Sequence, residues 1–99
     1  MTHIIEFAES VRAQLKDLPA HQRALLLEAI EKQLVYEPLM ETRNRELLRP
    51  NPVAPWELRV GHLRVFYEVA SEEPNVVRVL AIGQKRGNKL LIAGKEVKL

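Results

Sequence analysis

Residues 56–69 read Trp-Glu-Leu-Arg-Val-Gly-His-Leu-Arg-Val-Phe-Tyr-Glu-Val, and this stretch decides the fold. Apolar and polar residues alternate on both sides of Gly61-His62, which is the pattern of two half-buried strands joined by a tight turn. Glycine supplies the positive φ angle that such turns need. The sequence therefore predicts a β-hairpin in which Val60 pairs with Leu63.

That pairing divides the hairpin into two faces. We expect the core face to carry Trp56, Leu58, Val60, Leu63, Val65, Tyr67 and Val69. The opposite face then carries Glu57, Arg59, Arg64, Phe66 and Glu68. Arg59 lies directly opposite Arg64, although like charges at paired positions destabilise a sheet. Two interpretations remain open: the arginines present a site to an anion, or they belong to an ordinary solvated face beside Glu57 and Glu68.

Length and composition narrow the class of protein. A chain of 99 residues is predicted to form a single domain, residues 1–99. The absence of cysteine excludes disulfide and thiolate chemistry and favours a cytoplasmic location. No apolar run approaches the roughly 20 residues that a bilayer crossing requires, so no membrane partner is expected. The three histidines lack metal-ligand spacing, and neither a metal nor a cofactor is predicted.

The first half of the chain predicts a strand followed by two helices. Apolar residues over 3–7 favour a short strand, and apolar spacings of three and four from Glu9 to about Leu18 indicate an amphipathic helix. Pro19 is expected to open a second helix that runs to about Val35, since proline suits the first helical turn. Its inward side is predicted to carry Leu26, Ala29, Ile30 and Leu34.

The second half predicts a sheet, which makes the fold class α+β. A loop is expected over 39–55, with a short turn of helix at 45–48. The hairpin follows, then a strand over 76–82 rich in β-branched residues and a small terminal hairpin around 90–97. We expect the two-helix hairpin to pack against one face of this small antiparallel sheet.

Basic residues concentrate in the sheet half and could converge there. If Val77, Val79 and Ala81 face the helices, Arg78 shares the open face with the hairpin arginines. Phe66 on that face could stack a nucleic-acid base, or it could pack beneath the loop of prolines at 50–55. No arrangement of nucleophile and base, and no phosphate-binding loop, can be recognised.

Residues 56–67 and the segment Val-Arg-Val-Leu-Ala-Ile-Gly-Gln-Lys-Arg at 77–86 together resemble the RelE/ParE superfamily of small toxins from type II toxin–antitoxin modules. The resemblance covers essentially the whole chain, because that superfamily has the same order of elements. It implies one of two activities. RelE-type members are ribosome-dependent ribonucleases that cut messenger RNA, whereas ParE-type members act on DNA gyrase. It also implies a cognate antitoxin that wraps around the toxin in a hetero-oligomer.

The resemblance assigns roles to particular residues. In the ribonucleases, residues at the positions of Arg59, Arg64, Lys85 and Arg86 hold the scissile phosphate, which makes these four the expected catalytic set. The remaining residues predicted to bind RNA are Arg78, Lys89, Phe66 and His62.

One position departs from the RelE pattern. A tyrosine or histidine commonly follows the basic pair, but this chain continues Gly87-Asn88-Lys89. Arginine cannot normally give up a proton, so His62 and Lys89 are left as candidates for proton transfer. His62 could equally be a solvent-facing turn residue. Tyr67 aligns with a family tyrosine, but strand alternation places it in the core.

The leading hypothesis is a RelE-like toxin that binds RNA phosphates on its sheet face and cleaves ribosome-bound messenger RNA. The alternatives are a ParE-like gyrase inhibitor, which is not an enzyme, and an attenuated member that acts mainly in an antitoxin complex. The apolar run Leu90-Leu91-Ile92 could receive an antitoxin segment or could simply cover the core.

Overall fold

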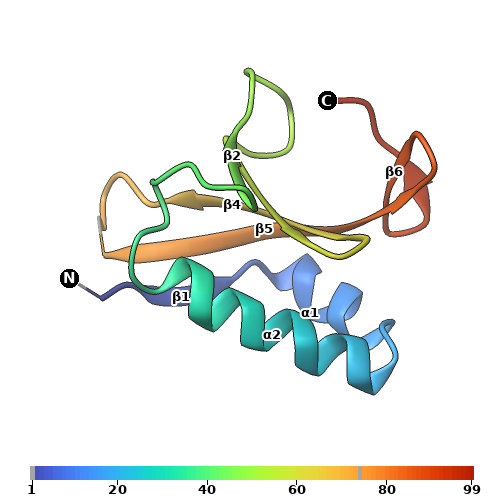
Figure 1. The fold of residues 1–99 in the computed structure, drawn as a ribbon, viewed down its shortest axis with the longest axis horizontal. Helices are drawn as coiled ribbons and strands as arrows, with labels where there is room; N and C mark the ends of the chain where they lie inside the picture. Colours follow the sequence, from blue (N-terminus) through green and yellow to red (C-terminus); the bar gives the residue numbers. More distant parts are fainter. Residues whose placement is uncertain (1, 74) are drawn as a thin grey trace.

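Two helices cover one face of a sheet in the computed structural model, which describes residues 2–73 and 75–99 (Figure 1). Strand β1 (Ile4–Phe7) leads into α1 (Glu9–Lys16), and Pro19 directly precedes α2 (Ala20–Leu34). The helical hairpin predicted from the sequence is therefore confirmed. Leu26, Ile30 and Leu34 of α2 are buried against the sheet, whereas Ala29 is half-buried.

Arginine side chains satisfy carbonyl groups at the carboxyl end of each helix. Arg23 donates from Nε to Leu15 O at 3.0 Å and from Nη2 to Leu18 O at 3.1 Å. Arg45 donates from Nη1 to Gln33 O in the last turn of α2. The last four carbonyls of a helix lack partners within the helix, so both arginines stabilise helix ends.

Arg45 also explains one wrong prediction. The expected turn of helix at 45–48 is instead strand β2 (Arg45–Leu47), which pairs antiparallel with β3 (Trp56–Val60). Extended backbone allows Arg45, opposite Leu58, to bury its side chain against the end of α2. Tertiary pairing overrides local helical propensity at this short segment.

The remaining strands are β4 (Leu63–Val69), β5 (Val76–Arg86), β6 (Lys89–Ile92) and β7 (Lys95–Glu96). The sheet order is β2-β3-β4-β5-β6-β7, and β1 pairs in parallel with the first part of β5. Strand β6 pairs with the last part of β5, so β5 extends to Arg86 and not only to Ile82 as expected. The α+β class and the terminal hairpin are confirmed.

The predicted hairpin register is also confirmed. Val60 pairs with Leu63, Arg59 with Arg64 and Trp56 with Tyr67. Every residue expected on the core face contributes to the main hydrophobic core beneath the helices. Trp56 and Tyr67 stack there with ring centroids 6.1 Å apart.

A β-bulge in β5 changes which side chains face the helices. Tyr67 pairs with Val79 and Phe66 with Ala81, so Leu80 is an extra residue opposite β4. Val79 and Ile82 both belong to the helix-side core, whereas Leu80 and Ala81 pack on the opposite, open face. The prediction that Ala81 faces the helices is therefore wrong, because the bulge breaks the alternation by one residue.

The open face carries a second, smaller core. Phe66, Ala81 and Leu90 are buried in it together with Ala54 of the β2–β3 loop. Figure 1 shows this loop and the chain's carboxyl end on the side of the sheet away from the helices. Of the two alternatives for the run 90–92, receiving an antitoxin segment or covering the core, Leu90 takes the second, because it is buried in this smaller core.

The hydroxyl of Tyr67 gives a stability prediction. It donates a buried hydrogen bond to Pro38 O at 2.6 Å, and burial raises its pKa above the ordinary value of 10.0. Replacing Tyr67 by Phe should lower the unfolding free energy by roughly 1–2 kcal/mol at pH 7. A raised pKa contributes stability that is complete below pH 10 and is lost as the pH rises further.

Urea unfolding at pH 7 and pH 11 measures both effects. We expect the wild type to lose stability between these pH values and Tyr67→Phe to lose less. Tyr36→Phe is the matched control, because Tyr36 is 65% exposed. Equal pH dependence in the wild type and in Tyr67→Phe would contradict the prediction.

Candidate functional site

The predicted site residues gather at one end of the sheet. The β3–β4 turn at 61–62 and the β5–β6 turn at 87–88 lie at the same end, because Leu63 pairs with Gln84. We call this region the basic end and define it by Arg59, His62, Arg64, Lys85, Arg86 and Lys89.

The basic end has cations on both faces of the sheet. Arg64 lies on the open face, and so does Lys85, which pairs with Leu90 of the second core. Arg86 and its pairing partner Lys89 lie on the face toward the helices. The prediction that Arg59, Arg64, Lys85 and Arg86 share one face is therefore wrong for Arg86. The bulge at Leu80 does not alter the alternation that separates Lys85 from Arg86.

Two kinds of cation occur in this region. Arg59 is neutralised, since its Nη2 lies 2.7 Å from Glu46 Oε2 and its Nε lies 3.4 Å from Glu57 Oε1. Within residues 2–73 and 75–99, no carboxylate lies within ion-pair distance of four cations, which we call the unpaired cations: Arg64, Lys85, Arg86 and Lys89.

Arg64 is held in place by backbone carbonyls. Its Nη1 donates to Gly61 O at 2.8 Å and to Leu63 O at 2.9 Å. A guanidinium has five N–H donors, so Arg64 retains donors for another acceptor. Arg86 makes a weaker contact, 3.5 Å from Nη2 to Gln84 Oε1.

Arg78 shares the open face with Arg64, as predicted, but it belongs to a different cluster. It contacts carboxylates of Glu6 at 3.1 Å, Glu68 at 3.3 Å and Glu72 at 3.3 Å. The hydrogen bonds with Glu6 and Glu72 raise the pKa of Arg78. Its partner Glu68 lies four residues along β4 from Arg64, roughly 13 Å away. Arg78 therefore ties strands together and is not part of the basic end.

The structure contradicts the predicted role of Phe66 and does not test that of His62. The prediction that Phe66 is available to stack a base is wrong, because its side chain is 0% exposed in the second core. The alternative, packing beneath the loop of prolines, is confirmed, because Phe66 belongs to the same buried cluster as Ala54 of that loop, and Val53 packs against this cluster. His62 is exposed on the turn, and its carbonyl accepts a hydrogen bond from Lys85 N at 2.8 Å. Its role in proton transfer stays a prediction.

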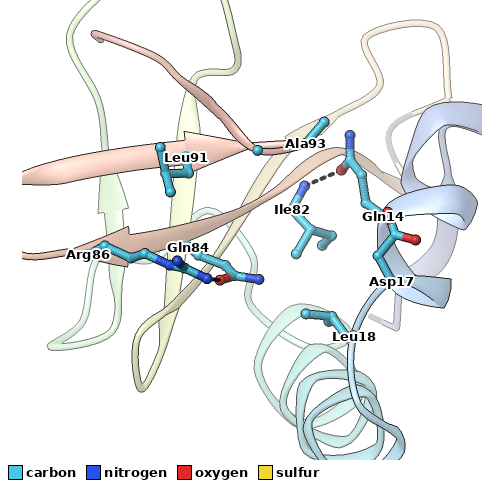
Figure 2. A pocket seen from close by; sticks show the side chains of 9 residues that line it. Gln14, Asp17, Leu18, Ile82, Gln84, Arg86, Leu91 and Ala93 are labelled. Atoms are coloured by element: carbon cyan, nitrogen blue, oxygen red, sulfur yellow. Dashed lines mark hydrogen bonds between the residues drawn. The ribbon is translucent and has the colours of Figure 1, made fainter.

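The structure adds a pocket that sequence reasoning missed. This cleft of about 250 Å³ lies between α1 and the β5–β6 hairpin, on the helix side of the basic end (Figure 2). Its lining includes Gln14, Asp17, Leu18, Gln84, Arg86 and Leu91. Gln14 and Asp17 share one side of a helix, and Gln84 and Arg86 share one side of a strand. Both spacings can be read from the sequence. The sequence does not show that this side of the helix lies beside this side of the strand.

The described residues form neither a membrane-spanning helix nor a cluster of metal ligands. No helix there is long and apolar enough to cross a membrane. No group of three or more histidine or acidic side chains in the described ranges is arranged to hold a metal ion.

Comparisons with known proteins agree with the fold. A family model described as the ParE toxin of the type II toxin–antitoxin system parDE matches residues 5–88. The RelBE2 toxin–antitoxin complex from Mycobacterium tuberculosis contains a chain of 25% identity and TM-score 0.72, with 86% of this chain and 93% of that chain covered. The archaeal RelE–RelB complex from Pyrococcus horikoshii OT3 gives 25% identity and TM-score 0.64, with coverage of 89% and 99%. A search of curated proteins gave no match.

Proposed function

We propose that this chain, which belongs to the ParE toxin family of type II toxin–antitoxin systems within the RelE/ParE superfamily, binds RNA phosphates at its basic end and cleaves ribosome-bound messenger RNA. Family membership and the relatives solved as toxin–antitoxin complexes support a cognate antitoxin as its partner. The observation that carries the RNA proposal is the set of unpaired cations at one end of the sheet.

Cations without a carboxylate partner bind a polyanion more favourably than cations that are already in an ion pair. Binding a phosphate at Arg64 requires no existing ion pair to break, whereas binding at Arg59 competes with Glu46 and Glu57. Arg64 is opposite Gly83, so Lys85 is its diagonal neighbour at roughly 7–8 Å. Glu57 lines the same groove as Lys85, but its carboxylate is already paired with Arg59. An RNA strand that crosses the end of the sheet would meet cations on both faces.

The chemistry that follows is transfer of the phosphodiester to the neighbouring 2′-oxygen. The 2′-oxygen attacks phosphorus and the 5′-oxygen leaves, which yields a 2′,3′-cyclic phosphate and a free 5′-hydroxyl. In this proposal Arg64 and Lys85 stabilise the charge that develops on the phosphoryl oxygens. His62 accepts the proton of the 2′-hydroxyl, and solvent water gives a proton to the leaving 5′-oxygen. Lys89, on the face toward the helices, binds a phosphate of the RNA strand where it passes around the end of the sheet.

Inhibition of DNA gyrase is the second candidate, and a specific observation favours it. The family tyrosine is represented here by Tyr67, whose hydroxyl is buried on Pro38 O and cannot reach a substrate. This leaves few groups for proton transfer at the basic end. A toxin that only binds its target needs none of them.

Induction of the chain without its antitoxin in a bacterial host distinguishes the two candidates. We expect growth to stop and mapping of transcript 5′ ends to show cuts within translated messengers. The cuts should be lost in Arg64→Ala. The matched control for that variant is Arg12→Ala, since Arg12 is an exposed arginine on α1 outside the basic end. Growth arrest with intact transcripts and a loss of negative supercoiling in plasmid DNA would overturn the ribonuclease proposal in favour of gyrase inhibition.

A further inference from the structure

The pocket beside α1 has apolar walls and polar groups that suit a flat ring with hydrogen-bonding edges. The pocket has apolar surface from Leu18, Ile82, Leu91 and Ala93, and amide, carboxylate and guanidinium groups from Gln14, Asp17, Gln84 and Arg86 (Figure 2). Its volume of about 250 Å³ lies below the roughly 300–1,000 Å³ of typical drug-sized ligand pockets. A single nucleobase matches this size better than a larger cofactor does.

The hydrogen bonds within the protein determine which donors and acceptors in the pocket remain available to a ligand. Gln14 Oε1 accepts from Ile82 N at 2.7 Å, so its amide nitrogen keeps both donors. Gln84 Oε1 accepts from Arg86, and Figure 2 shows the Gln84 amide nitrogen turned away from Arg86 toward α1. Within residues 2–73 and 75–99, the Asp17 carboxylate makes no hydrogen bond or ion pair and remains an acceptor.

The position of Asp17 is unfavourable for helix stability. It is the carboxyl-terminal cap residue of α1, where the helix dipole disfavours negative charge. Arg23 donates to carbonyls at the same helix end and offsets part of this cost. Residues that oppose local stability are often found at functional sites, because function and not folding retains them. This observation is independent of the shape of the pocket.

We propose that this pocket binds a guanine base of the RNA held at the basic end. The Watson–Crick edge of guanine carries adjacent N1–H and N2–H donors, which the two oxygens of Asp17 can accept together. Its O6 acceptor receives the amide donors of Gln84 and Gln14. Adenine, cytosine and uracil do not present two adjacent donors, so a carboxylate discriminates against them. Arg86 lines the same pocket and holds a phosphate next to the bound base.

This inference rests on the proposed RNA-binding function, and the pocket can be tested apart from it. The full chain labelled with nitrogen-15 is titrated with GMP, AMP, CMP and UMP in separate experiments at one salt concentration. We expect GMP to shift the side-chain amide signals of Gln14 and Gln84 at the lowest concentrations. Asp17→Asn should raise the dissociation constant for GMP about tenfold and leave that for AMP unchanged.

The controls separate recognition from folding and from charge. Asp17→Asn removes a charge that the helix dipole disfavours, so this variant should remain folded. Glu31→Gln makes the same charge change at an exposed site on α2 and should bind GMP as the wild type does. Equal affinities for GMP and AMP, or an unchanged GMP affinity in Asp17→Asn, would overturn the guanine pocket. Transcript cuts that still depend on Arg64 would then leave the proposed function standing.

Discussion

Replacing Phe66 by Ala is expected to lower the free energy of unfolding by about 3–5 kcal/mol. The ring is fully buried on the open face among Ala54, Ala81 and Leu90. The space beneath it depends on Gly83, where an added Cβ would lie 2.9 Å from Leu90 Cδ1 and 3.1 Å from Phe66 Cε2. The ring and the glycine therefore fit each other closely, and truncation would leave a cavity.

Urea unfolding followed by circular dichroism measures this loss. Domains of this size have unfolding free energies of roughly 5–15 kcal/mol, so the loss in Phe66→Ala should be a large part of the total and should clearly lower the urea midpoint. Phe66→Leu keeps most of the apolar volume and should lose clearly less stability. If Phe66→Ala kept the wild-type midpoint and lost RNA affinity instead, the ring would be a base-stacking residue and the buried position would be wrong.

Replacing Arg64 by Ala is expected to reduce the rate of transcript cleavage about 100-fold, which is typical when one stabilising donor is removed from a charged transition state. Arg59→Ala should have a smaller effect, since Glu46 and Glu57 already compensate its charge. The two residues are directly opposite each other on neighbouring strands, so the comparison holds the hairpin and the face of the sheet constant.

Cleavage of a ribosome-bound messenger by the purified chain gives the rates, and unfolding curves confirm that both variants fold. The salt dependence of RNA binding is a second measurement. Losing one phosphate contact at Arg64 should lower the slope of log K against log salt by about 0.7 for a single strand. If Arg59→Ala and Arg64→Ala reduced the cleavage rate equally, the distinction between ion-paired and unpaired cations would be contradicted.

Alternation and turn residues were sufficient to predict much of the fold. The hairpin register followed from the pattern on both sides of Gly61-His62, and the helical hairpin followed from apolar spacing and Pro19. Strand β2 could not be predicted, because three residues carry no period and their pairing depends on Arg45 reaching α2. For Phe66 the sequence left two alternatives, stacking on a base or packing beneath the loop at 50–55, and the structure confirms the second.

The sequence predicted which basic residues form the candidate site better than it predicted their positions and partners. The basic residues do gather at one end of the sheet, but their partners depend on tertiary placement. The sequence gives no sign that Glu46 neutralises Arg59 or that three carboxylates surround Arg78. The pocket at Gln14, Asp17 and Gln84 depends on the packing of α1 beside β5, and no local pattern encodes that contact.

The extra residue at Leu80 has a consequence for how β5 tolerates a change in length. Val79 pairs with Tyr67 and Ala81 with Phe66, so each residue beyond the bulge takes the face of its β4 partner. Deletion of Leu80 would remove the bulge and leave those pairs in register. Lys85 would still lie on the open face and Arg86 toward the helices. A bulge of this kind lets a strand gain or lose one residue while the surface that meets the target stays the same.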